Sequence, residues 1–236
     1  MSDAAGGLAA LDAEVVSCRA CPRLVEWRER VGRERRRAFA GEAYWSRPIP
    51  LFGDDPSPVM VLGLAPAAHG GNRTGRVFTG DRSGDFLVAA MHRAGFANQA
   101  HSVHRDDGLR LIGCRMTPAV RCAPPANRPL PEERDRCLPY LVREIALTRP
   151  RVIVALGAIA WDAALRALTA AGVPAVRPRP RFGHGAEARL GDLLLVGSYH
   201  PSQQNTFTGR LTPEMLDAVL VRARAAAQAT EANAAG

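Results

Sequence analysis

Four short apolar runs, separated by helix-compatible stretches, constrain the fold more than any other feature of this sequence. The runs are continuous and do not alternate strictly between apolar and polar residues. Such runs are typical of parallel strands that are buried on both faces of a sheet. We therefore expect strands at Val59–Leu64, at Leu109–Cys114 with a continuation that could reach Thr117, at Arg151–Leu156 and at Leu193–Tyr199.

Helix-compatible stretches separate or follow these strands, at Ser83–Ala94, Pro131–Leu147, Ala158–Ala171 and Thr212–Ala226. In the last one, Thr212 suits the cap position and Pro213 the first helical position. The alternation predicts an α/β fold, a three-layer α/β/α sandwich around a central, mainly parallel four-stranded sheet. No repeat or boundary divides the chain, so we expect one domain over residues 1–236, with frayed tails at about 1–10 and 225–236.

The composition is that of an ordinary globular protein, with 236 residues, 47% hydrophobic and 23% charged. No apolar run reaches the ~18 residues that a membrane-spanning helix needs. The first residues lack the basic and apolar regions of a secretory signal. We expect a cytoplasmic monomer without a membrane partner.

All 31 basic residues are arginine, and the formal net charge is +8. The simplest interpretation of arginine in place of lysine is a bias in genome composition, and the physical consequences hold whatever the cause. A positive charge favours a polyanionic partner such as DNA, and arginine forks suit phosphate groups. The basic segment Val25–Arg37 is interpreted either as a solvated helix face or as a patch facing DNA or a partner. Without lysine, no Schiff base can form on a lysine amine.

Polar and glycine-rich residues follow the predicted strands. APAAHGGNRTGRVFTGD follows the first, TPAVRCAPPANRP the second, GAIAW the third and HPSQQNTFTG the fourth, while Pro174–Gly185 is expected to be a long basic loop. In open α/β sheets, ligands bind beyond the carboxyl ends of the strands. The sequence therefore predicts a site at that edge of the sheet.

Five cysteines are present, an odd number that argues against a disulfide framework. Cys18 and Cys21 form a CxxC pair, and Cys122 and Cys137 supply two further thiols; Cys114 lies in a predicted strand and is interpreted as a core residue. From the residues alone, the four thiols could be unligated structural cysteines, zinc ligands or ligands of a [4Fe–4S] cluster, or the CxxC pair could be redox-active.

Two long motifs, GLAPAAHGGNRTGRVFTGD and HPSQQNTFTGRLT, together with CRACPRLV and RCAPPANRPLPEERDRC, resemble the uracil-DNA glycosylase superfamily, specifically its family 5 (the UDGb type). The resemblance extends from about Cys18 to about Leu216. It implies an α/β/α fold, a [4Fe–4S] cluster held by Cys18, Cys21, Cys122 and Cys137, and excision of uracil from DNA. Members of this type are also associated with other deaminated bases, including hypoxanthine.

One position departs from the pattern of many superfamily members. The third residue of the G-x-x-P motif is often acidic or an amide, where it helps a water molecule attack. Here it is Ala65, a feature that family 5 shares. The nearest acidic candidate is Asp81, which matches the family's acidic position in FTGD.

Cleavage of an N-glycosidic bond places positive charge on the sugar and negative charge on the departing base. We assign His200 as the donor to the base carbonyl oxygen, Asp81 to the water or the sugar cation, Asn127 to the base edge and Phe78 to stacking on the flipped base. Each has a simpler interpretation: His200 a structural histidine, Asp81 a helix cap, Asn127 a turn residue and Phe78 a core aromatic.

The resemblance also suggests residues that shape the base pocket and contact DNA. The first loop is shaped by Gly63, Ala65, His69 and Gly70, and the candidate DNA contacts are Arg73, Ser202, Gln203, Gln204, Asn205 and Arg210. Without lysine, we expect a monofunctional enzyme that leaves an abasic site. The competing hypothesis is a non-catalytic DNA-binding module stabilised by an iron–sulfur cluster or by zinc. A small-molecule hydrolase or transferase has little support, because the GxSxG and P-loop motifs are missing.

Overall fold

A mixed sheet forms the centre of the molecule. The computed structural model describes residues 2–53 and 57–234. In that part of the chain the strand order is β1-β3-β2-β4-β6-β5, and β3, β2, β4 and β6 run parallel while the two edge strands are antiparallel. The strands are β1 Phe52–Gly53, β2 Val59–Gly63, β3 Cys114–Pro118, β4 Val152–Leu156, β5 Glu187–Leu190 and β6 Leu193–Ser198.

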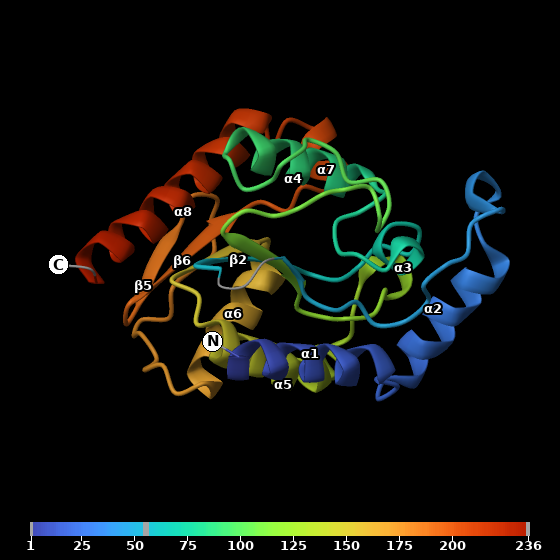
Figure 1. The fold of residues 1–236 in the computed structure, drawn as a ribbon, viewed down its shortest axis with the longest axis horizontal. Helices are drawn as coiled ribbons and strands as arrows, with labels where there is room; N and C mark the ends of the chain where they lie inside the picture. The colour runs from blue at the N-terminus through green and yellow to red at the C-terminus, as the bar shows by residue number, and fades with distance from the viewer. Residues whose placement is uncertain (1, 54–56, 235–236) are drawn as a thin grey trace.

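Helices cover both faces of this sheet (Figure 1). One face carries α4 and α8, and the other carries α6, with α5 and α1 packed alongside. The bounds are α1 Ser2–Ser17, α2 Pro22–Glu34, α3 Gly71–Thr74, α4 Arg82–Arg93, α5 Pro131–Thr148, α6 Ala158–Ala170, α7 Gln203–Phe207 and α8 Pro213–Ala234, with short 3₁₀ turns at Arg37–Phe39 and Pro125–Asn127. The predicted three-layer α/β/α architecture is confirmed.

The two sides of each central strand are buried in different cores. In β2, Val59 and Val61 lie in the core shared with α4 and α8, whereas Met60 and Leu62 lie in the core shared with α5 and α6. Every residue of β2, β4 and β6 is buried. This double burial explains why the runs are continuously apolar.

The second predicted strand was misplaced. The strand β3 begins at Cys114, where the predicted strand Leu109–Cys114 ends, and its continuation through Thr117 is correct. Gly113 has a φ of +63°, which breaks the extended backbone, and Ile112 before it is 51% exposed. Leu111 instead forms an isolated bridge with Ala97. Cys114 is fully buried in β3, as expected for a core residue.

Two edge strands were not predicted, so the sheet has six strands in the described residues and not four. The strand β1 has only two residues, and β5 alternates exposed and buried residues because only one of its faces is covered. Edge strands this short carry too few residues for a clear pattern.

Both chain ends are helical as far as the structure describes them. The helix α1 starts at Ser2 and α8 extends to Ala234, whereas residues 1, 235 and 236 lie outside the described part; fraying of the ends stays a prediction. Thr212 caps α8 as predicted, since its hydroxyl accepts from the backbone N–H of Met215 at 3.3 Å. No described helix has both the length and the apolar character needed to cross a membrane.

Candidate functional site

The predicted site residues gather where the parallel strands end. The strand β2 ends at Gly63, and β6 ends two residues before His200. Between them, β4 is followed by Gly157, whose φ is +98°. A Cβ on Gly157 would lie 3.4 Å from the Cβ of His200, so the histidine sits directly against the start of α6. The sheet topology therefore brings the first and fourth loops together.

Phe78 lies between these two strand ends. Its ring rests on Gly63, where a Cβ would come within 2.7 Å of Cζ, and its centroid lies 6.2 Å from that of His200 at an interplanar angle of 38°. The backbone of Phe78 has a φ of +49°, a strained conformation for a bulky residue. The ring is buried in the core around α4 and α8, so it serves packing and also stands beside His200.

Asp81 caps the helix α4, as the simpler interpretation expected. Its Oδ1 accepts from the backbone N–H of Gly84 at 3.0 Å. A Cβ on Gly70 would overlap Oδ2, so the carboxylate lies directly against the first loop. Burial raises the pKa of Asp81, an effect that the helix N–H groups partly offset. The cap therefore holds a destabilised carboxylate at the edge of the loop.

His200 is half-buried, and none of the described side chains forms a hydrogen bond with its ring. Burial lowers its pKa to about 4. The imidazole is therefore neutral at pH 7 and can donate one N–H to an acceptor. Its backbone is fixed, because its carbonyl accepts from Asn205 Nδ2 at 2.8 Å and from the backbone N–H of Ser202 at 2.8 Å.

We expect the NMR titration of the His200 ring to centre near pH 4, well below the ordinary value of about 6.5. Between these two values the unfolded chain binds a proton that the folded protein does not. The free energy of unfolding is therefore unaffected by this histidine above about pH 6.5 and falls as the pH drops from 6.5 toward 4. A ring that titrates near 6.5 in the folded protein would contradict the effect of burial, and one that titrates above pH 7 would contradict a neutral donor.

His69 and Ala65 line the same loop but have different neighbours. His69 Nδ1 lies 3.0 Å from the Tyr44 hydroxyl, and burial, with Arg36 and Arg73 nearby, lowers the pKa of its ring. Ala65 packs against the cysteine cluster. The first loop thus connects the predicted base pocket with the cysteines.

Arg73 was predicted to contact phosphate. In the structure its side chain forms hydrogen bonds within the protein. Its side chain is buried, and its guanidinium donates to the carbonyls of His69 and Gly80 and to the Glu42 carboxylate. It also lies over the Phe39 ring, 3.9 Å from the centroid. All its nitrogens have protein acceptors, so we do not retain a phosphate role for Arg73.

Two of the residues predicted to contact DNA form hydrogen bonds that stabilise the fourth loop. The Ser202 hydroxyl caps the helix α7, accepting from the backbone N–H of Asn205 at 3.4 Å. The side chain of Asn205 holds the carbonyl of His200. These residues position His200, and a DNA contact by either stays a prediction.

The other residues of this loop face outward. Gln203, Gln204 and Arg210 are exposed, and Arg210 lies over the Tyr199 ring at 4.6 Å. Phe207, at the end of α7, is 68% exposed, with the guanidinium of Arg82 5.5 Å from its centroid. Phe207 was not among the predicted site residues, although an aromatic residue inside the polar run HPSQQNTFTG was a usable signal.

Asn127 is not brought into contact with the other site residues. It is exposed at the end of a 3₁₀ turn, with a φ of +55°, a conformation that asparagine tolerates. Its place in this 3₁₀ turn agrees with the turn interpretation. Its role at a base edge stays a prediction.

Four of the five cysteines line one small cavity, together with Arg28, Arg121 and Tyr140. None of the described cysteines forms a disulfide. Burial raises the pKa of Cys122 to about 12 and that of Cys137 to about 11, so without a bound group these thiols stay protonated. The described part of the chain contains no group of three or more His, Cys, Asp or Glu side chains placed to hold a metal ion.

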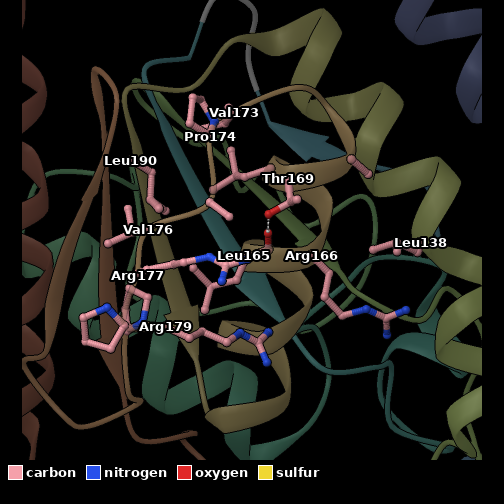
Figure 2. A pocket seen from close by; sticks show the side chains of 15 residues that line it. Leu138, Leu165, Arg166, Thr169, Val173, Pro174, Val176, Arg177, Arg179 and Leu190 are labelled. Atoms are coloured by element: carbon pink, nitrogen blue, oxygen red, sulfur yellow. Dashed lines mark hydrogen bonds between the residues drawn. The ribbon is translucent and has the colours of Figure 1, made fainter.

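A large cavity lies elsewhere (Figure 2). It measures about 890 Å³ and lies between the C-terminal half of α6, around Leu165 and Thr169, and the basic loop that contains Pro174 and Arg177. The predicted site is near the opposite, N-terminal end of α6, where His200 meets Gly157. This cavity and the candidate site therefore lie at opposite ends of α6.

Comparison with known proteins places this geometry in a family. A model of the uracil DNA glycosylase superfamily matches residues 50–224, which include both motifs at the strand ends. The chain belongs to the uracil DNA glycosylase superfamily. The resemblance inferred from the sequence is confirmed.

Curated relatives of this glycosylase superfamily member match over most of its length. It is 54% identical over 227 residues to the Type-5 uracil-DNA glycosylase of Mycobacterium tuberculosis, covering 95% of this chain and 83% of the relative. It is 50% identical over 212 residues to that of Thermus thermophilus, with 89% and 94% covered. With that of Pyrobaculum aerophilum it shares 47% identity over 211 residues, with 89% of each chain covered.

Proposed function

We propose that this protein is a monofunctional DNA glycosylase that flips uracil out of DNA and excises it hydrolytically, starting base-excision repair. The observation that carries the proposal is the meeting of Phe78, Asp81 and His200 around the first loop, in a chain about half identical to type-5 uracil-DNA glycosylases. Hypoxanthine and other deaminated bases are proposed as further substrates.

The proposed chemistry separates charge across the glycosidic bond. The flipped uracil stacks on or beside Phe78, and the neutral ring of His200 donates its N–H to the carbonyl oxygen on which negative charge develops. The carboxylate of Asp81 orients water toward C1′ or stabilises the sugar cation. Burial strengthens both interactions, because a low local dielectric increases the effect of each charge.

The first loop offers additional donors. In the part of the chain that the structure describes, the backbone N–H groups of Ala65, Ala68 and His69 have no protein acceptor. We assign to them the second carbonyl of the base or a neighbouring phosphate. Asn127 is assigned to the base edge, because it is exposed and its amide offers both a donor and an acceptor.

We assign DNA contacts to the exposed residues of the fourth loop. Gln203, Gln204 and Arg210 are placed to meet the phosphate backbone. Phe207 is assigned to the space that the flipped nucleotide vacates, because apolar side chains support kinked or unstacked steps. Phe207 is therefore proposed as a DNA contact in addition to those predicted from the sequence.

Phe207→Ala is expected to lower uracil excision from duplex DNA about tenfold, because stacking of one aromatic side chain on a base is worth about 1–3 kcal/mol. Excision from single-stranded DNA should change less, since no pair has to be opened. Phe207→Leu is the matched control and retains most of the activity. Equal losses of excision activity on duplex and single-stranded DNA would contradict this role of Phe207.

We propose that Cys18, Cys21, Cys122 and Cys137 hold a [4Fe–4S] cluster. All four line one cavity, and Arg28 donates to the Cys122 sulfur at 2.9 Å. In the described residues, Nε and Nη1 of the buried Arg121, which lines the same cavity, lack hydrogen-bond partners, as expected beside a negatively charged group. These residues suit a cluster of anionic sulfurs. When bound, it fastens the N-terminal segment to the loop before α5 and takes no part in hydrolysis.

Strand cleavage tests whether the enzyme is monofunctional. We expect uracil-containing duplex treated with the protein to break only after alkali or heat, because the chain contains no lysine to form a Schiff base. The measurement is a denaturing gel of a 5′-labelled strand with and without alkali. Breakage without alkali, by protein free of contaminating nuclease, would contradict a monofunctional enzyme.

A further inference from the structure

Arg28 is an unusual member of the basic segment Val25–Arg37. That segment was interpreted as a solvated helix face or as a patch toward DNA or a partner, and Arg28 fits neither interpretation. Its side chain is 2% exposed and points into the protein from α2. Arginine is almost never fully buried unless it is paired, so its acceptors identify its purpose.

The guanidinium of Arg28 faces two of the four cysteines. Nη1 donates to the Cys122 sulfur at 2.9 Å, and Nη2 donates to the carbonyl of Cys18 at 3.2 Å. Cys18 belongs to the N-terminal CxxC pair, and Cys122 follows β3. One side chain therefore joins the two halves of the proposed cluster site. Among the described residues, Nε of Arg28 has no hydrogen-bond partner.

The backbone of Arg28 reaches the first loop of the site. Its carbonyl accepts from Asn72 Nδ2 at 3.2 Å, and Asn72 is 1% exposed. The same amide nitrogen lies 3.4 Å from the carbonyl of Ala68, and the backbone N–H of Asn72 donates to Ala67 at 3.1 Å. Asn72 thus holds the turn that leads to Gly70, the residue against Asp81.

We propose that Arg28 is a positioning residue that links the cluster sulfurs to the base-binding loop through Asn72. This inference rests on the proposed function, because it requires the proposed cluster to be bound. The charged hydrogen bond to Cys122 stabilises negative charge on the sulfur and therefore raises the reduction potential of the cluster. The bond between the Arg28 carbonyl and Asn72 fixes the loop against which Asp81 is held.

The test compares Arg28→Met and Asn72→Ala with the wild-type protein, all purified anaerobically. Arg30→Met is the matched control, because Arg30 lies on the same helix with its side chain 43% exposed and, among the described residues, pairs with Glu26 and the Trp27 ring. The readouts are iron and sulfide content, the midpoint potential in a mediator titration with dithionite, and kcat and KM on uracil duplex.

We expect Arg28→Met to shift the potential to a more negative value and to lower kcat/KM about 10- to 100-fold, as loss of outer-shell contacts does in metal sites. Asn72→Ala should keep the wild-type iron content and potential and still lower kcat. Arg30→Met should match the wild type in every readout. If Arg28→Met does not fold, Arg28→Lys, which keeps a charged donor, should restore the cluster with an altered potential.

Two outcomes would overturn the link. One is an unchanged potential and kcat/KM in Arg28→Met; the other is wild-type excision by Asn72→Ala. A wild-type protein that contains no iron or sulfide yet excises uracil would refute the cluster and leave the glycosylase assignment standing. A wild-type protein that holds the cluster and excises no base would refute the proposed function instead, while the potential of Arg28→Met would still decide the contact with Cys122.

Discussion

Asp81→Asn is expected to lower the rate of uracil excision by about 10²- to 10⁴-fold, the usual range for a positioned acid or base, without weakening the binding of uracil-containing duplex. The substitution removes the charge that we assign to the attacking water or the sugar cation. It changes little else, because asparagine is as good a helix cap as aspartate. The carbonyl oxygen of asparagine can still accept from the backbone N–H of Gly84.

The stability of the same variant separates the two roles of Asp81. Burial raises the pKa of this carboxyl, so its charged form lowers the free energy of unfolding at neutral pH. That cost is present above the raised pKa and disappears as the pH falls through it. Asp81→Asn should therefore melt at or above the wild-type temperature at pH 7, whereas Asp81→Ala, which loses the cap, should melt lower. Wild-type excision rates in Asp81→Asn would leave Asp81 with the capping role alone.

Cys137→Ala is expected to abolish the visible absorbance of the cluster, remove most of the bound iron and lower Tm by about 10 °C or more. Cys137 belongs to α5, whereas Cys18 and Cys21 lie between α1 and α2, so the proposed cluster would join segments that are far apart in the sequence. Metal analysis of the wild-type protein should give about four iron atoms per chain.

Cys114→Ala is the matched control for this loss. Cys114 is also fully buried, but it lies in β3 within the core around α4 and α8 and not with the other four cysteines. Its removal should cost the packing of one sulfur atom and the weak hydrogen bond from its thiol to the Phe96 carbonyl, and leave the iron content unchanged. Equal melting temperatures for the two variants, with no iron in the wild type, would favour unligated cysteines. One zinc atom per chain would favour the structural-zinc interpretation.

The central sheet could be predicted because burial on both faces leaves a clear signature in the sequence. The strands β2, β4 and β6 were placed within a residue or two for this reason. The position of β3 was wrong because an apolar run was broken by Gly113, whose left-handed conformation cannot be read from the run itself. The edge strands β1 and β5 are too short, or too exposed, to show a pattern.

The placement of the candidate site residues was predictable where they follow strand ends, as His200 and the first loop do. Which arginines are buried could not be predicted from the sequence. Arg73 and Arg28 read as surface charges in the sequence, because nothing local indicates that Glu42 or Cys122 will lie beside them after folding. Contacts between residues so far apart in the chain depend on the tertiary arrangement and leave no short-range pattern.

Base release from DNA tests the account most directly. A labelled duplex carrying one uracil is incubated with anaerobically purified protein, with hypoxanthine-containing and unmodified duplexes in parallel, and the free base is measured alongside binding of the duplex. We predict release of uracil, some release of hypoxanthine and none from unmodified DNA. Binding of uracil duplex with an intact cluster but no release from any lesion would contradict the account, and would make the protein a DNA-binding module on a glycosylase scaffold.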